Sequence, residues 1–571
     1  MDNGTSRASW RGQLTLRGVI IGCVGCAIIT ASSVYTALRL GALPWPIIFA
    51  AVISLFFLKL LGNASLNEAN VTHTIMSAGA MVAGGLAFTI PGAWMLGLAS
   101  QIGWVQIFLV ALAGTGLGLV CTALIHRHFI VDANLEFPTG NAAAQTLRAT
   151  EAGGRTGRQL FGSMGVAGTY ALLRDGLHLL PAMLLQLPIP GVAFGIYNSP
   201  MMLSVGFLIG GVAVAWWLLG GVVANFGIVV AGSAAGLWDV ANAQGIVKSL
   251  GMGLMMGSGV AVVIKDILPQ MAGVVRGLGG GAPREGHREG EANDPSSLVS
   301  GNLRLDAGIL GLATAAIAVL VCFGLQLGPI PAVAVVLLTF VTTIMSAQSC
   351  GQTGIDPMEI FGLIVLLLVS AFARLQEVQL FFIAGVVAVA CGLAGDVMND
   401  FKAGHVLGTD PRAQWLGQAI GGVLGALVAA GVMVALVSAY GPDAFGPDKE
   451  FVSAQASVVA TMVSGIPSVP AFVLGLAGGL ALYFARLPAM MLGLGVYLPF
   501  YMSVTAALGA VARIVYEQVS ARRNAGLSEA ERQEAVEKAQ ESGLVVASGL
   551  LGGESVMGVI IAFASIFASM A

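Results

Sequence analysis

Apolar residues follow one another in long runs along almost the whole chain, and short polar stretches separate these runs. About twenty consecutive apolar residues are enough for a helix to cross the hydrocarbon core of a bilayer. By this criterion the chain holds about sixteen candidate spans, among them 160–187 and 201–220. Two stretches, 132–152 and 452–468, are short or interrupted by Gly and Pro, and we expect re-entrant or broken helices there. The pattern predicts an all-α polytopic membrane protein.

Composition strengthens this interpretation. Of the 571 residues 57% are hydrophobic and only 10% are charged, and the mean hydropathy is +0.88. In soluble domains about a quarter of the residues are charged. The 79 glycines fit helices that pack closely in lipid, because small residues let two backbones approach. The polar, basic N-terminus leads directly into a full span, so no removable signal is expected. The net charge of −3 indicates no particular partner.

Several short stretches recur in the same order in the second half of the chain. "EFPTGNAA" (136–143) returns as "EFVSAQAS" (450–457), "MMLSVG" (201–206) as "MMLGLG" (490–495), and "GLMMG" (253–257) as "GLLGG" (549–553). Such self-similarity is typical of duplicated units. We therefore predict a first membrane repeat at 1–268, a polar Gly-rich linker at 269–302, a connecting helix at 303–328 and a second membrane repeat at 329–571.

The distribution of Lys and Arg suggests how the repeats are oriented. Basic residues concentrate in the N-terminal tail and in the loop 126–158, whereas the equivalent second-half loop, 440–450, contains only Lys449. The opposite holds for 513–541, which is rich in Arg, and its first-half equivalent 241–248, which has only Lys248. Because basic loops stay cytoplasmic, the two units are expected to face opposite ways. Inverted repeats are a common plan of secondary transporters.

A few charged residues interrupt the apolar runs, where lipid makes a charge costly. Asp396 and Asp400 are four positions apart and should share one helix face, with Lys402 close enough to offset one charge. The pair is either a gate or proton relay, or a set of solvated charges at the membrane interface. Glu554 is either a protonatable or substrate-facing carboxylate, or a cap at a helix start after Gly552 and Gly553. The four candidates for proton coupling or gating are Asp396, Asp400, Lys402 and Glu554.

Polar residues near helix breaks are the candidates for substrate binding, because broken backbone at membrane depth exposes N–H and C=O groups. Pro499 should break a span beside Tyr497. His73 either senses pH near neutrality or is simply hydrogen-bonded at a helix entrance, which is the commoner case. The stretch 146–158 is either part of such a broken segment or an ordinary loop at the membrane interface. The full candidate set is Glu68, Asn70, His73, Glu136, Asn141, Gln145, Gln455, Tyr497 and Pro499.

Signatures of enzymes are missing from the sequence. The chain has no G-x-S-x-G, no H-E-x-x-H and no P-loop. We therefore expect no catalytic residues, no cofactor and no metal site, and any pumping must use an ion gradient. Cys23 and Cys26 form a C-x-x-C inside a predicted span, where small packing residues are the favoured interpretation. No extended basic and aromatic surface suggests nucleic acid.

Five segments together resemble the oligopeptide transporter (OPT) family, which includes the yellow-stripe-like metal-chelate carriers. They are "NEANVTHTIMSAG" (67–79), "LEFPTGNAAAQTLRA" (135–149), "GDVMNDFKAGHVLGTDPRAQWLGQ" (395–418), "LPAMMLGLGVYLPFYMSVTAALGAVAR" (487–513) and "SGLLGGESVMGVIIA" (548–562). The resemblance implies import of small peptides or peptide-like metal chelates, usually driven by protons, by a prokaryotic member of the family. The NPG and KIPPR motifs of eukaryotic peptide carriers are not present as such, and Glu68-Ala69-Asn70 stands where prokaryotic relatives commonly have Glu-Asn-Asn.

These observations lead to one expected function and two alternatives. The first is proton-coupled uptake of short oligopeptides by alternating access, the second is transport of metal chelates, and the third is a channel or an intramembrane enzyme. The expected partners are the small-molecule substrate, protons and the lipid bilayer of a bacterial inner membrane. A homodimer is one option for assembly.

Overall fold

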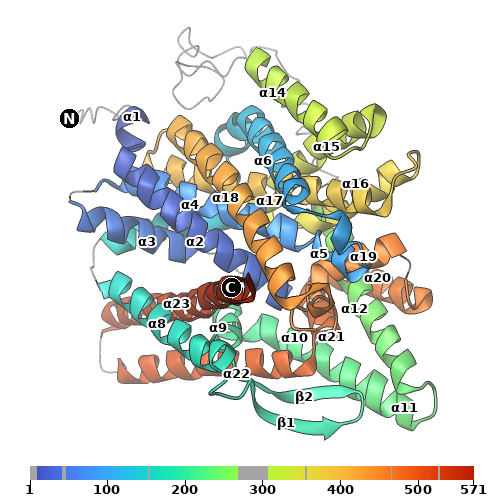
Figure 1. Ribbon diagram of the computed structural model, residues 1–571. Coiled ribbons are helices and arrows are strands. Elements are labelled where there is room, and N and C mark those ends of the chain that lie inside the picture. The colour runs from blue at the N-terminus through green and yellow to red at the C-terminus, as the bar shows by residue number, and fades with distance from the viewer. Residues whose placement is uncertain are drawn as a thin grey trace.

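The computed structural model describes residues 10–41, 47–62, 64–151, 155–267, 307–353, 356–464, 466–524 and 528–570. The predicted linker 269–302 lies outside the described residues, as do the first four residues of the predicted connecting helix. The described part is built almost entirely of helices, with one two-stranded sheet (Figure 1). The predicted fold class is therefore confirmed.

The first half of the chain forms α1 (Trp10–Gln13), α2 (Leu16–Leu40), α3 (Ile47–Leu60), α4 (Leu66–Ala87), α5 (Pro91–Met95), α6 (Trp104–His126), α7 (Pro138–Glu151), α8 (Arg155–Ala171), α9 (Pro200–Ile209), α10 (Gly211–Val222), α11 (Gly232–Ala234) and α12 (Val240–Val262). The second half forms α14 (Ala307–Val319), α15 (Pro329–Thr353), α16 (Met358–Ser370), α17 (Glu377–Leu407), α18 (Pro411–Tyr440), α19 (Ala454–Ser464), α20 (Val469–Phe484), α21 (Ala489–Tyr497), α22 (Phe500–Arg523) and α23 (Glu529–Met570). Turns of π-helix extend several of these helices, at Arg127–Asp132, Leu172–Gly176, Val223–Ala231, Val263–Ile267 and Leu320–Gly324.

Nine helices of the described residues are long and apolar enough to cross a membrane, and five further apolar helices are shorter. The two stretches expected to be interrupted contain short helices, α7 and α19. The break expected at Pro499 is present, since α21 ends at Tyr497 and α22 begins at Phe500. The helices are thus interrupted in the places that the sequence predicts.

Two predicted spans differ from the structure. The helical part of 160–187 ends at Gly176, and an antiparallel hairpin follows, made of β1 (Met183–Ile189) and β2 (Val192–Tyr197). Pro188 and Pro190 cannot continue a helix, and Gly191 takes the positive φ of 76° at the turn. The predicted span 201–220 is divided into α9 and α10 at Gly210, whose φ is 91°. Periodicity alone does not reveal either break.

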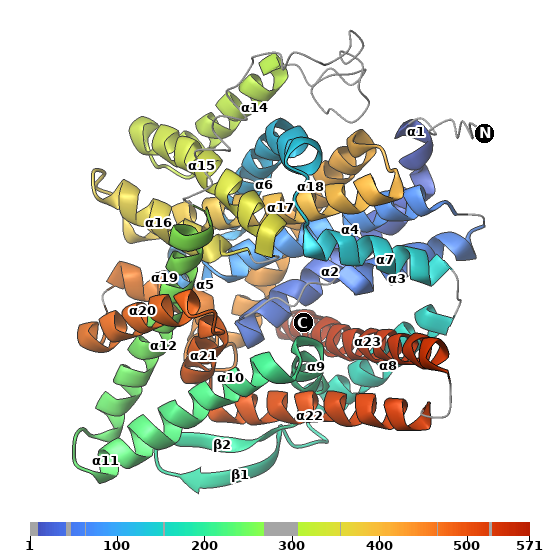
Figure 2. The same cartoon turned by 180° about the vertical axis from the view of Figure 1, so that it is seen from behind.

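The main helix pairings occur twice, with the two halves of the chain exchanged. Helix α4 packs against α18 as α17 packs against α6, and α8 packs against α23 as α12 packs against α20. Figures 1 and 2 both show α8 alongside α23 and α12 alongside α20. Each half therefore buries helices of the other, and neither half forms a separate body.

At the centre of this arrangement α4 and α17 run antiparallel. Asn70 Nδ2 donates to Thr409 Oγ1 at 3.1 Å near one end of the crossing. A Cβ atom at Gly85 would lie 2.6 Å from the Val389 backbone near the other end. The absence of a side chain at Gly85 is what lets the two backbones approach.

The glycine-rich stretches that recur in the sequence lie at the exchanged contacts. In α12, a Cβ atom at Gly257 would lie 2.2 Å from the Leu476 carbonyl oxygen of α20. In α23, a Cβ atom at Gly553 would lie 2.2 Å from the Met164 carbonyl oxygen of α8. The "GLMMG" and "GLLGG" stretches thus do the same work, because both provide a side-chain-free surface for a helix of the other half.

Candidate functional site

Asp396 and Asp400 share one face of α17, where that helix crosses α4 and α18, and are 1% and 0% exposed. Gln418 Nε2 donates to Asp400 Oδ2 at 2.6 Å and lies 3.4 Å from Asp396 Oδ2. Ser77 Oγ donates to Asp400 Oδ2 at 3.0 Å. The alternative in which the two aspartates are solvated at an interface is therefore wrong.

His73 of α4 lies beside this acid pair. Its side chain is fully buried, and Nδ1 is 3.6 Å from Asp400 Oδ1. Neither ring nitrogen has a hydrogen-bond partner within the described residues, so the simpler interpretation of a hydrogen-bonded histidine at a helix entrance does not hold there. A protonated imidazole at this place would form an ion pair with the carboxylate.

Lys402 does not contact the two aspartates as expected. Its Nζ donates to Asn134 Oδ1 at 2.8 Å, in the stretch between α6 and α7. Positions two apart on a helix do not face each other, which places Lys402 on another side of α17 than Asp400. The expectation that Lys402 offsets one charge of the pair is therefore wrong.

Two further acids near α17 escaped the sequence analysis. Asp356 precedes α16 and accepts a hydrogen bond from Ser346 Oγ at 2.7 Å. A Cβ atom at Gly395 would lie 2.7 Å from Asp356 Oδ2, so this carboxylate touches α17 next to Asp396. Glu359 is buried in the first turn of α16. Both residues stand at the start of an apolar run, where an acid is easily taken for an ordinary helix cap.

Glu554 lies in the middle of α23, so the alternative that it caps the start of its own helix is wrong. Its Oε1 is 2.7 Å from Arg174 Nη2 and accepts a hydrogen bond from Ser199 Oγ at 2.8 Å. Its Oε2 accepts from the Met201 backbone N–H at 2.8 Å, at the N-terminus of α9. Glu554 therefore caps a helix of the other half and neutralises a buried guanidinium.

Arg174 was missed because the sequence places no base near Glu554. It lies in the π-helical turn after α8 and also forms two hydrogen bonds, of 2.7 and 2.5 Å, with Asp175. Its remaining nitrogen donates to the Asn198 carbonyl oxygen. A basic residue followed by an acid inside an apolar run, as in "LLRDG", is the signal that could have identified it.

A second buried guanidinium, Arg39, belongs to the last turn of α2. It is 6% exposed and donates to the Tyr197 hydroxyl and to Glu450. Its guanidinium carbon lies 5.5 Å from the ring centre of Tyr35 and 5.6 Å from that of Phe451. Sequence reasoning missed Arg39, although an arginine that ends an apolar run is the same kind of signal as a buried acid.

The predicted substrate residues lie on separate elements. Glu68 pairs with Arg17, whose Nη2 is 2.6 Å from Oε2, and Asn70 binds Thr409. On α7 and just before it, Asn141 Nδ2 donates to the Glu136 carbonyl oxygen at 2.7 Å. The side chains of Glu136 and Gln145 are exposed, and that of Asn141 is partly exposed. Gln455 on α19 and Tyr497 at the end of α21 are buried, and Pro499 caps α22.

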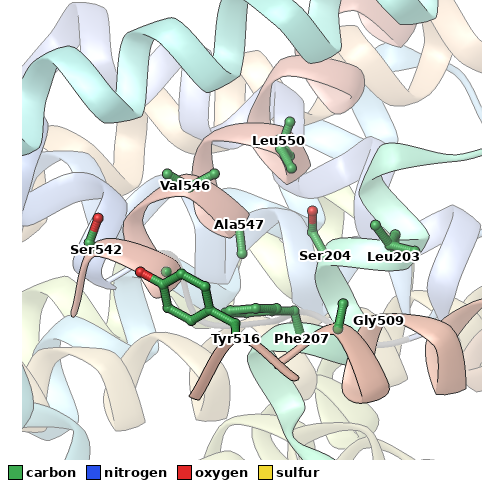
Figure 3. A pocket seen from close by; sticks show the side chains of 11 residues that line it. Leu203, Ser204, Phe207, Gly509, Tyr516, Ser542, Val546, Ala547 and Leu550 are labelled. Atoms are coloured by element: carbon green, nitrogen blue, oxygen red, sulfur yellow. The ribbon is translucent and has the colours of Figure 1, made fainter. Parts of the chain in front are cut away.

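A cavity of about 200 Å³ lies between α9, α22 and α23 (Figure 3). Leu203, Phe207, Tyr516, Val546 and Leu550 contribute to its wall, which is almost entirely apolar. None of the predicted site residues lines it. An apolar wall offers few partners to a peptide backbone or carboxylate, so the buried charged groups, and not this cavity, form the candidate site.

Comparison with known proteins finds one matching family and several similar transporters. The family described as "OPT oligopeptide transporter protein" matches residues 13–565. The chain is similar to a protein of Haemophilus influenzae named "Putative oligopeptide transporter", with 27% identity over 93% of this chain and 92% of that protein. It is also similar to a probable metal-nicotianamine transporter of Arabidopsis thaliana, with 20% identity over 81% of this chain and 74% of that protein.

The family match covers nearly the whole chain, and the helical membrane architecture agrees with it. The proteins of this family are transporters and not enzymes, as expected from the missing catalytic motifs. The chain therefore belongs to the OPT family of membrane transporters.

Proposed function

We propose that this transporter takes up short oligopeptides together with protons, by alternating access across a bacterial inner membrane. The name of the Haemophilus influenzae relative supports the peptide substrate. The observation that carries the proton coupling is the buried group of Asp396, Asp400 and His73, where α4, α17 and α18 meet.

Two carboxylates in a membrane interior are costly while both are ionised, because the charges repel and water is excluded. Asp400 receives hydrogen bonds from neutral groups, Ser77 and Gln418, which can bind either protonation state. His73 offers a third place for a proton within 3.6 Å. A proton entering this group removes charge from the interior and so favours movement of α17 against α4.

The exchanged helix pairings support alternating access. The two predicted repeats, 1–268 and 329–571, would be related by an axis in the membrane plane, since their central helices α4 and α17 pack antiparallel. In this proposal α14 and the turn that follows it form the connecting helix. In such a plan the two repeats can exchange their conformations through the two-fold axis, which gives an outward-open and an inward-open state.

The second candidate cargo is a metal chelate, which the names of the plant relatives favour. Within the described residues no group of three or more His, Cys, Asp or Glu side chains could hold a metal ion. A metal would therefore be carried through its organic ligand, and recognition would fall on the ligand's carboxylates and amines. A channel is the least favoured alternative, because the buried ion pair between Arg174 and Glu554 closes the contact between the halves.

Purified protein in lipid vesicles tests these proposals. We expect radiolabelled alanine peptides of two to four residues to accumulate when the outside is acidic, and accumulation to cease when a protonophore dissipates the gradient. Accumulation that is independent of the pH gradient would reject proton coupling. Uptake through a carrier should saturate as the solute concentration rises, whereas flow through a channel should not.

A competition experiment separates the two cargoes. Nicotianamine with and without bound iron is added to the peptide uptake assay. Inhibition by the loaded form alone favours the chelate, whereas inhibition by unlabelled peptide alone favours the peptide. Empty vesicles and vesicles with an unrelated membrane protein are the controls.

A further inference from the structure

We propose that Arg39 is the binding point for a carboxylate of the transported solute, and that Glu450 holds this point as a tethered competitor in the conformation described. The inference rests on the proposed function, since it names the chemical group of the cargo that the transporter recognises. It applies equally to the C-terminal carboxylate of a peptide and to a carboxylate of a chelate.

The surroundings of Arg39 are those of an anion site. The guanidinium lies among the rings of Tyr35, Tyr197 and Phe451, at 5.5, 5.9 and 5.6 Å from their centres. Aromatic rings on several sides hold a planar guanidinium in place and keep its edge free for hydrogen bonding. The Nε atom is buried and has no hydrogen-bond partner within the described residues. A carboxylate bound along that edge would satisfy this donor.

The acid that now pairs with Arg39 can leave at low cost. The side chain of Glu450 is 45% exposed, whereas that of Arg39 is 7% exposed. When the pair separates, Glu450 returns to water, but Arg39 stays buried and needs another anion. A carboxylate from the solute would supply that anion without any change in the net charge of the site.

The loop that carries Glu450 keeps it close to Arg39. The Ser453 backbone N–H donates to the Leu38 carbonyl oxygen at 2.9 Å, one residue before Arg39. Ser453 and Asp448 both have positive φ, 45° and 62°, which non-glycine residues adopt only at a cost. The loop is thus fixed at one end and holds two residues in a costly backbone conformation close to Arg39.

Arg174, another buried arginine, does not qualify as an anion site. Arg174 already contacts two carboxylates, those of Asp175 and Glu554, as well as the Asn198 carbonyl oxygen.

Further tyrosines extend the wall around Arg39, since Tyr440 packs edge-on against Phe451 at 5.1 Å and Tyr501 packs against Tyr197 at 5.7 Å. Tyrosine rings with polar tips suit a short peptide, which presents both apolar and hydrogen-bonding groups.

The test compares ligand binding by the full-length protein and its Glu450→Gln variant. The probes are alanine peptides of two to four residues with a free C-terminus, and the same peptides as C-terminal amides, each titrated while thermal unfolding is followed. A tethered competitor weakens the apparent affinity in proportion to the fraction of sites it occupies. We expect E450Q to bind the free acids about tenfold more tightly than the wild type does, with no gain for the amides.

Three further variants define the outcome. Asp448→Asn is the matched control, because Asp448 lies on the same loop but pairs with Lys248, and it should bind like the wild type. Glu450→Asp keeps the charge on a shorter side chain and should fall between wild type and E450Q, so the proposal stays testable if E450Q does not fold. Arg39→Gln should lose the preference for the free acids over the amides.

Equal affinity of wild type and E450Q for the free acids would overturn the proposal, as would the same gain with the amides. If no alanine peptide binds either protein while wild-type vesicles still accumulate a peptide, this inference fails and the proposed function stands. If wild-type vesicles accumulate no peptide, the proposed function itself fails.

Discussion

Arg174 and Glu554 are 380 positions apart in the sequence, yet Arg174 Nη2 lies 2.7 Å from Glu554 Oε1. The two side chains are 0% and 1% exposed. One belongs to the turn after α8, in the first half, and the other to α23, in the second half. This ion pair fixes the two halves to each other at a point where neither charge can reach water.

The Arg174–Glu554 pair should show strong coupling in a double-mutant cycle. Removal of one partner of a buried ion pair leaves a buried charge and costs about 3–5 kcal/mol. We expect Arg174→Met and Glu554→Gln each to lower the melting temperature in detergent, and the double variant to be less destabilised than the sum of the two. Thermal unfolding followed by tryptophan fluorescence measures this. Strictly additive losses would show that the pair contributes nothing as a unit.

Gly425 of α18 should not tolerate even a methyl group. A Cβ atom there would lie 2.4 Å from the Gly79 Cα of α4, and backbone cannot move aside as a flexible side chain does. We expect Gly425→Ala to cost about 1–3 kcal/mol by overpacking. Gly431→Ala on the same helix is the control, because the nearest atom is 3.9 Å away. If both variants melt at the same temperature, the close approach of α4 and α18 is wrong.

Asp400→Asn should uncouple transport from the proton gradient. The asparagine keeps an acceptor for Ser77 and Gln418 but cannot bind and release a proton. We expect accumulation against a gradient to fall to the level of empty vesicles, while exchange of labelled for unlabelled solute continues. The control is Glu377→Gln, in the exposed first turn of the same helix. Loss of exchange as well would mean that Asp400 serves solute binding instead.

For Lys402 we expect the opposite result, namely that its replacement leaves proton coupling intact. Its ammonium binds Asn134 and not the acid pair, so it joins α17 to the stretch before α7. We expect Lys402→Gln to slow uptake several-fold, because this contact is weakened, and to leave the dependence on the pH gradient intact. Uptake measured at two outside pH values, for wild type and variant, checks this. A variant whose uptake no longer depends on the pH gradient would return Lys402 to proton coupling.

The sequence was informative for features that depend on residues close together in the chain. Runs of apolar residues identify the helical membrane architecture, and the i, i+4 spacing places Asp396 and Asp400 on one face of α17. Pro499 marks a helix break because it lacks an N–H. Each of these features depends on neighbours in the chain, and periodicity or residue type is sufficient to detect them.

The sequence was uninformative where the partner is distant. Nothing near Glu554 in the sequence indicates Arg174, and the spacing of Lys402 from the two aspartates does not reveal that its Nζ binds Asn134 instead. The hairpin Met183–Tyr197 was hidden because its residues are as apolar as those of a span. Which charged groups meet depends on helix packing, and that packing is set by glycine contacts across several hundred residues.

The exchange of helices between the two halves bears on how the protein is made. The side of α8 that carries Leu160 and Met164 is covered by α23, the last helix of the described chain. At about 5–20 residues per second, translation takes on the order of tens of seconds to reach α23 after α8 has left the ribosome. During that interval α8 must be shielded by lipid or by the insertion machinery. A chain that stops before α23 would keep this surface of α8 uncovered.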